Sequence, residues 1–164
     1  MVSIALPKRI EEKLRKRAEE TGTLPEELTV DLIVKSLKEE IDPEELVEHY
    51  QTLSEKYLAE AKQLLSKGDL VQSSEKLWGA TSLTVKMVAA KRGLKLEKHG
   101  SLWDFISNLS TEREGEDIIT SFHVANSLHR NFYENQMNQE ALEIAAGEID
   151  KLIAKLIAKL KGIS

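Results

Sequence analysis

From residue 42 onward, apolar side chains recur every three or four positions, which is the spacing of an amphipathic helix. One stripe runs over residues 46–64, and the next segment, 70–93, is apolar on most sides. Three more stripes follow at 102–109, 118–132 and 142–160. A helix that is apolar on most sides belongs in the middle of a bundle. The pattern therefore predicts four long helices and one short helix, packed as a bundle with short loops.

Polar capping residues and glycines mark the expected ends of these helices. Asp42, followed by Pro43 and Glu45, has the pattern of a capping box with proline at the first helical position. Gly68 is expected to end the first long helix of the bundle. The other expected helix starts are Asp69, Ser101 and Asn138.

The first forty residues follow a different pattern. Residues Val2–Leu6 alternate apolar and small side chains with period two, and Pro7 stops this alternation, which predicts a short strand. A charged helix is expected over 8–20, with Gly22 as its left-handed stop, and a second helix from Thr23 to about Glu40. No second strand is predicted in the chain. We therefore expect the strand to pair with another copy as a two-stranded ribbon.

The order strand, helix, helix over residues 1–41 resembles the ribbon-helix-helix family of dimeric DNA-binding modules, and the resemblance implies a homodimer. In that family the outward side chains of the ribbon enter the major groove. Here these are Ser3 and Ala5, which lack the long donors that read base edges. The second helix begins with Glu26 and Glu27, which would repel a phosphate at the positive helix end. We interpret residues 1–41 as a dimerisation arm, with a DNA-binding regulator acting through Ser3 and Ala5 as the alternative.

Composition and charge narrow the classes of function. The chain has 164 residues, of which 41% are hydrophobic and 31% charged, as expected for a folded protein. It contains no cysteine, which excludes disulfides, thiolate nucleophiles and Cys-ligated metals. The formal charge of −5 provides no overall field that attracts nucleic acid. The sequence shows neither a long apolar run nor a signal-peptide layout, so we expect a cytoplasmic protein that does not enter membranes.

Two motifs carry a resemblance to a known family. They are Ser74-Glu75-Lys76-Leu77-Trp78-Gly79-Ala80 and Leu128-His129-Arg130-Asn131-Phe132-Tyr133-Glu134. With these motifs the chain resembles the archaeal PaREP family of uncharacterised proteins, which is similar in layout to the HEPN superfamily of helical bundles. The resemblance implies an all-α protein with a HEPN-like up-and-down bundle over residues 42–164, after the strand-helix-helix arm.

The catalytic HEPN proteins are ribonucleases that use an arginine followed closely by a histidine on one helix. In this chain Arg92 and His99 have a compatible separation, but Gly93 breaks the helix between them. Arg130 has no histidine after it within reach. We therefore assign no catalytic residue. The chain is interpreted as a non-catalytic homodimeric binding or interaction module, with a HEPN-type ribonuclease or toxin as a second alternative.

A ligand, if one binds, is expected between the bundle helices, and a nucleotide or nucleic acid is the ligand considered. His99 has the residue type of a general base or of a side chain packed on a neighbouring aromatic ring. Two interpretations are open for Lys86. Its ammonium points into a pocket, or its long aliphatic chain carries the ammonium out to the surface. No cofactor and no metal site is expected, because the four histidines are not spaced as ligands. The candidate ligand-binding residues are Trp78, Lys86, His99, His129, Arg130 and Tyr133.

Overall fold

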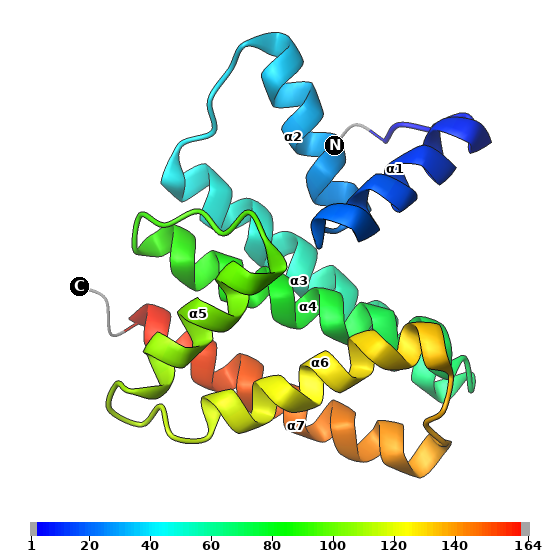
Figure 1. The fold of residues 1–164 in the computed structure, drawn as a ribbon, viewed down its shortest axis with the longest axis vertical. Coiled ribbons are helices and arrows are strands. Elements are labelled where there is room, and N and C mark those ends of the chain that lie inside the picture. Colours follow the sequence, from blue (N-terminus) through cyan, green and yellow to red (C-terminus); the bar gives the residue numbers. More distant parts are fainter. Residues whose placement is uncertain (1–2, 162–164) are drawn as a thin grey trace.

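The computed structural model describes residues 3–161, and every regular element in this range is a helix (Figure 1). Val2, the first residue of the predicted strand, lies outside the described residues. The all-α fold class predicted from the sequence is confirmed for this range. The helices are α1 (Lys8–Thr21), α2 (Pro25–Leu37), α3 (Pro43–Ser66), α4 (Leu70–Lys91), α5 (His99–Ser110), α6 (Ile118–Glu134) and α7 (Gln139–Lys161).

Most of the helix ends follow the capping residues of the sequence. The Asp42 carboxylate accepts from the backbone N–H groups of Glu44 and Glu45, and the Glu45 side chain accepts from the Asp42 N–H in return. Asp69 accepts from the N–H of Gln72, and the amide oxygen of Asn138 accepts from the backbone at the start of α7. Each of these bonds satisfies an amide that the first helical turn leaves free.

The start of α5 differs from the prediction. The helix begins at His99, two residues before the expected cap, and Lys98 is its N-cap residue without a side-chain hydrogen bond. Ser101 lies inside the first turn, where its N–H donates to the Lys98 carbonyl at 3.0 Å. The expected cap at Ser101 is therefore wrong, because the chain turns into the helix before this serine is reached.

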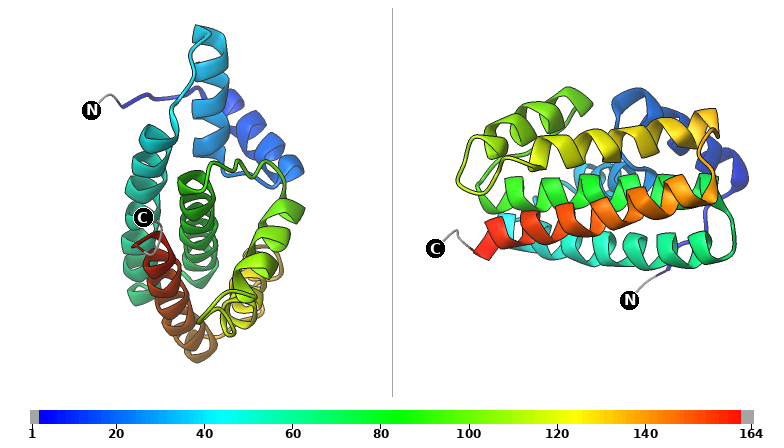
Figure 2. Two further views of the ribbon diagram at one scale, coloured as in Figure 1. Left: turned by 90° about the vertical axis from the view of Figure 1, so that its left-hand side faces the viewer. Right: turned by 90° about the horizontal axis from the view of Figure 1, so that it is seen from below.

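Helix α4 is the centre of the bundle, as its all-round apolar pattern predicted. Its residues 73–90 are almost all buried, and α3, α5, α6 and α7 surround it (Figure 2). Small side chains let the neighbours approach closely. At Gly79 an added Cβ would overlap the Tyr57 ring of α3, so only glycine fits at this position.

Helices α1 and α2 form an arm that projects from the bundle (Figure 1). Gly22 ends α1 in the left-handed conformation, with φ +69°, as the sequence predicted. Among the described residues 3–41 of the arm, only Ala18, Leu24 and Glu27 are buried. All three lie at or near the corner between the two helices. The corner and the first half of α2 are therefore at least partly covered, whereas residues 3–7, most of α1 and the end of α2 are exposed.

The predicted strand is not present in the single chain. Residues 3–7 belong to no helix or strand and are exposed, and no strand occurs anywhere in the range 3–161. The physical reason is that a strand is defined by its hydrogen-bonded partner, and the described chain offers no second extended segment to pair with it. The arm of this chain therefore consists of an extended segment and two helices, which corrects the strand-helix-helix expectation.

Candidate ligand-binding site

Three rings from three different helices stack where the arm corner meets the bundle. The Trp78 ring of α4 stacks on the His129 ring of α6, with centroids 4.9 Å apart and planes 30° apart. The His99 ring at the start of α5 lies 5.3 Å from Trp78 and 5.8 Å from His129. Tyr133, one helical turn after His129, meets the His129 ring edge-on at 5.6 Å. The rings form one continuous aromatic cluster.

The arm corner lies directly against this cluster. A Cβ added to Gly22 would lie 3.0 Å from the Cβ of His99, so the glycine brings the corner into close contact with the start of α5. Its left-handed φ independently favours glycine. The turn is closed by the N–H of Thr23, which donates to the Ala18 carbonyl at 3.0 Å. Gly22, which the sequence predicted as the end of a helix, thus also allows the close contact between the arm and the bundle.

Two hollows open on either side of this contact. The outer hollow, of about 580 Å³, has Glu19, Glu20, Glu97, Lys98, His99 and His129 among its lining residues. The narrower hollow, of about 90 Å³, is called the seam pocket here. Its walls include Arg15, Glu19, Glu75, Trp78, Phe132 and Tyr133. Both hollows therefore combine aromatic rings with carboxylates.

Burial shifts the pKa values of two titratable groups in the cluster, His129 and Tyr133. It lowers the pKa of His129, and the nearby His99 lowers this pKa further. The His129 imidazole is therefore neutral at pH 7. Burial also raises the pKa of the Tyr133 hydroxyl, with smaller contributions from the carboxylates of Glu19 and Glu75. At neutral pH the cluster presents a neutral imidazole and a protonated phenol.

Lys86 lies away from the aromatic cluster. Its ammonium donates to both carboxylate oxygens of Glu27 in α2, at 2.7 and 2.8 Å, and both side chains are buried, with 4% and 7% exposure. Glu27 also accepts from the N–H of Leu24 at 3.0 Å, which completes the capping of α2. Lys86 is therefore neither aimed into an open pocket nor extended to the surface. It anchors the arm to the bundle.

Of the six candidate ligand-binding residues, the structure brings four together: Trp78, His99, His129 and Tyr133. Lys86 is engaged by Glu27, and Arg130 is an exposed side chain that donates to Glu134 of the same helix at 3.2 Å. The two candidate cations for an anionic ligand are thus not part of the cluster. Of the DNA-reading candidates, Ser3 and Ala5 are both exposed in the extended segment.

Sequence patterning did not identify the acidic residues of this region. Glu27 and Glu75 each occupy a position in a charged helical turn that is typical of solvent-exposed side chains. The only available signal was the spacing of Leu24 and Glu27, since a glutamate at the third helical position can reach back to the cap. Nothing in the spacing indicated that Lys86, 59 residues later, would complete the pair.

Asn131 is one of the polar residues that follow Leu128, and its contacts are structural. This buried side chain donates to the Ser74 hydroxyl of α4 at 2.8 Å. Its amide oxygen accepts from the backbone N–H groups of Gln136 and Met137 at 2.8 and 2.9 Å. One side chain thereby connects α4 to the loop between α6 and α7, which is a structural role.

The arginine and histidine considered for ribonuclease chemistry have different partners in this chain. Arg92, the C-cap residue of α4, donates to Glu112 at 3.1 Å, and this bond lowers the pKa of the Glu112 carboxyl. Lys159 of α7 lies 3.3 Å from the same carboxylate. His99 instead contacts the rings of Trp78 and His129. The two residues do not form a shared site within the single chain.

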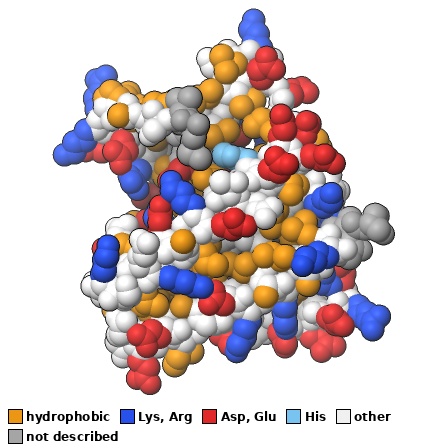
Figure 3. All heavy atoms as spheres, turned by 180° about the vertical axis from the view of Figure 1, so that it is seen from behind, with side chains coloured by type: hydrophobic (Ala, Val, Ile, Leu, Met, Phe, Trp, Pro, Cys, Tyr) orange, Lys and Arg blue, Asp and Glu red, His pale blue; other side chains and the backbone are white. Residues whose placement is uncertain are grey.

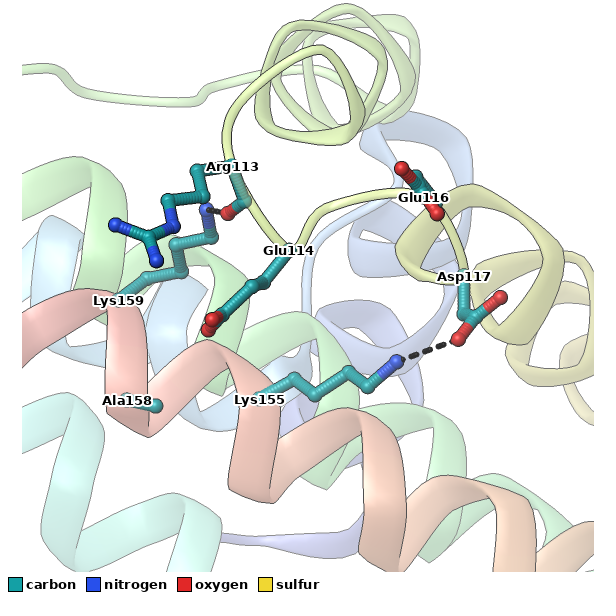
Figure 4. Close-up of a pocket in the computed structure, with 7 residues that line it drawn as sticks. All are labelled: Arg113, Glu114, Glu116, Asp117, Lys155, Ala158 and Lys159. Atoms are coloured by element: carbon teal, nitrogen blue, oxygen red, sulfur yellow. Dashed lines mark hydrogen bonds and ion pairs between the residues drawn. The ribbon is translucent and has the colours of Figure 1, made fainter.

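A further hollow, of about 400 Å³, lies between α7 and the loop that joins α5 to α6 (Figure 4). Lys155 donates to Asp117 at 2.8 Å, and this hydrogen bond lowers the pKa of the Asp117 carboxyl. Lys159 donates to the backbone carbonyl of Arg113 at 2.6 Å. The two lysines of α7 thus bond to the loop, one to a carboxylate and one to a backbone carbonyl, and fasten it to the helix.

Two classes of site find no support in the part of the chain that the structure describes. Within residues 3–161, no three histidine, aspartate or glutamate side chains converge as a bound metal ion would need. No helix in this range combines the length and the apolar content required to cross a membrane.

Comparison with known proteins places the bundle in a family. Residues 49–153 match the model of the archaeal PaREP1/PaREP8 family, which leaves α1 and α2 outside the match. A crystal structure of a protein from Sulfolobus solfataricus is similar, with a TM-score of 0.59 and 25% sequence identity. The similarity covers 66% of this chain and 96% of that one. No curated protein matches the chain. Since the family model spans more than half of the chain, this protein belongs to the archaeal PaREP1/PaREP8 family.

Proposed function

We propose that this PaREP1/PaREP8 protein is a non-catalytic interaction module that forms a homodimer through its N-terminal arm. The observation that carries the proposal is the apolar surface that the arm leaves open. Six large hydrophobic side chains of the arm are exposed by more than a third. They are Ile4 (66%), Leu6 (39%), Ile10 (37%), Leu32 (37%), Ile33 (41%) and Leu37 (66%).

This concentration of exposed side chains is unusual for a single folded chain. Scattered surface leucines are normal, but a contiguous apolar patch marks a protein–protein contact. Figure 3 shows hydrophobic side chains open on both helices of the arm. The two arm helices have 14 and 13 residues, and helices of this length are marginal in water without packing of an apolar face. A partner that covers this face would supply the missing packing.

A second copy of the chain fits this need. The extended segment 3–6 carries free backbone donors and acceptors, and an identical segment is able to pair with it in an antiparallel ribbon. The resemblance of the arm to ribbon-helix-helix modules, and of the bundle to HEPN proteins, supports the same assembly. Full burial of an exposed Leu or Ile side chain contributes about 1.5–3 kcal/mol. The six side chains are already partly covered, so each would gain a part of this value when a second copy covers it.

The start of α2 favours a protein partner over duplex DNA. Ribbon-helix-helix proteins that bind DNA hold a phosphate at this helix end. Here the Glu27 carboxylate accepts from the Leu24 N–H and is paired with Lys86, so an anionic group already occupies the position. Ser3 and Ala5 have short side chains that do not reach base edges with charged donors.

Sedimentation equilibrium over a range of protein concentrations tests the proposal. We expect a dimer in the wild-type chain and a shift to monomer in Ile33→Asp and Leu37→Asp. Ile144→Asp is the matched control, because Ile144 is 64% exposed on α7 of the bundle. This control is expected to remain dimeric. A wild-type chain that stays monomeric at high concentration, or a dimer that survives both arm substitutions, would overturn the proposal.

A further inference from the structure

The seam pocket combines two kinds of wall that together suit a cation. Aromatic side chains come from α4 and α6, namely Trp78, Phe132 and Tyr133. Carboxylates come from α1 and α4, namely Glu19 and Glu75. Aromatic faces attract a cation through the negative charge of their π-systems, and carboxylates accept its N–H groups.

The carboxylates of the pocket outnumber its basic side chains. In residues 3–161 neither Glu19 nor Glu75 makes an ion pair. The two basic side chains that act on Glu75 are bound elsewhere. Arg15 pairs with Glu11 of its own helix at 3.1 Å, and Lys76 pairs with Glu60 of α3 at 2.9 Å. Arg15 also lines the pocket, so its walls carry one guanidinium against the two carboxylates of Glu19 and Glu75, and this guanidinium is shared with Glu11.

The groups around Glu75 shift its pKa in both directions. Burial raises the pKa of Glu75; Arg15 and Lys76 oppose this rise, and the carboxylates of Glu26 and Glu19 add to it. A bound cation would relieve this repulsion. His129, the one imidazole of the pocket, is neutral at pH 7 and does not compete for the carboxylates.

The size of the pocket limits the ligand. Its volume of about 90 Å³ is roughly three times the ~30 Å³ that one water molecule occupies in the liquid. This space accepts an ammonium head and the first carbons of its stem. It is well below the roughly 300–1,000 Å³ of pockets that enclose drug-sized ligands, so the seam pocket suits a small ligand.

We infer that the seam pocket binds the primary ammonium end of a small aliphatic amine. The carboxylates of Glu19 and Glu75 accept its N–H groups, and the rings of Trp78 and Tyr133 lie beside its charged head and the first methylenes. The site lies where α1 meets α4 and α6, so a bound amine would also strengthen the contact between the arm corner and the bundle. The inference does not depend on the arm forming a homodimer.

Isothermal titration of the full-length chain with n-butylammonium chloride tests the inference, with n-butanol as the neutral probe of similar shape. We expect saturable binding of butylammonium and none of butanol. Glu75→Gln removes one carboxylate and is expected to weaken binding at least tenfold. Glu19→Gln, at an exposed position that does not endanger folding, is expected to weaken it several-fold. Glu116→Gln is the matched control, because Glu116 is exposed at the hollow beside α7.

Each alternative result overturns the inference. Equal binding of butanol would show that the pocket recognises only apolar shape. Unchanged affinity in both Glu75→Gln and Glu19→Gln, with melting temperatures equal to wild type, would place the amine elsewhere. Binding that appears only in Arg15→Gln would show that the Arg15 guanidinium fills the pocket in the native protein. Sedimentation of the same samples separates these outcomes from any failure of the homodimer.

Discussion

The buried pair between Lys86 and Glu27 leads to a quantitative prediction. Both side chains are more than nine-tenths buried, and the two N–O distances are 2.7 and 2.8 Å. Lys86→Met keeps the length of the side chain but leaves the Glu27 carboxylate inside the protein with only the Leu24 N–H as donor. Removing one partner of a buried pair typically costs about 3–5 kcal/mol. We expect a loss of this size in the free energy of unfolding.

Urea unfolding at one fixed protein concentration measures this loss. With a urea dependence of about 2 kcal/mol per molar, the midpoint should fall by about 1.5–2.5 M. Combining Lys86→Met with Glu27→Gln should recover at least half of the loss, because glutamine still accepts from the cap without a buried charge. Lys62→Met serves as the control, since the pair of Lys62 with Asp150 is largely exposed; its midpoint should not shift measurably.

A small effect of Lys86→Met on the free energy of unfolding would refute this reasoning. If Lys86→Met costs less than about 1 kcal/mol, which is the range of an exposed pair, water reaches Glu27 and the pair is not a buried anchor. If the double variant is less stable than Lys86→Met, the carboxylate contributes through contacts other than the lysine. Either result would also remove the argument that this pair fastens the arm to the bundle.

Three further predictions concern the bundle. Gly79→Ala should destabilise the protein by about 1–3 kcal/mol in urea unfolding, because the added methyl overlaps the Tyr57 ring, and Tyr57→Leu in the same chain should restore part of the loss. Asn131→Ala should cost about 1–3 kcal/mol and speed hydrogen exchange in the loop after α6, since it removes the partner of two backbone amides and of the Ser74 hydroxyl. The pKa of His129 is lowered in the folded state, so the unfolded chain binds more protons below about pH 6.5, and stability should fall as the pH drops from 7 to 5. His129→Phe should flatten this slope, and an unchanged slope would contradict the assignment.

The helices could be predicted from local features of the sequence. Asp42, Asp69 and Asn138 each precede an apolar stripe, and each one caps the helix that follows. These signals act within a few residues, because a cap bonds to an amide two or three positions away. The central place of α4 followed from its apolar residues on most sides, which left no face for solvent.

The site could be predicted only in part. Trp78, His99 and His129 were candidates because their rings suit stacking or proton transfer, and they do meet. The pairing of Lys86 with Glu27 was not predictable, because it depends on how the arm docks on α4. Local patterns contain no information on such long-range contacts.

The seam pocket and the absence of the strand also depend on contacts that local sequence patterns do not contain. Glu19 and Glu75 have the pattern of ordinary surface charges, and only the meeting of α1 with α4 and α6 places them beside one pocket. The alternation over residues 2–6 is a property of the chain, whereas strand formation also requires a partner, which a single copy does not supply.

Helix α2 is at least half-buried from the arm corner to residue 31, and its side chains become exposed toward Leu37. Helix α2 has 13 residues and so extends about 20 Å from that corner. A rotation of roughly 10° at the corner therefore moves the far tip of α2 by about 3 Å, close to the width of one side-chain contact. The packing of the corner therefore determines where the exposed apolar side chains near the end of α2, Ile33 and Leu37, lie.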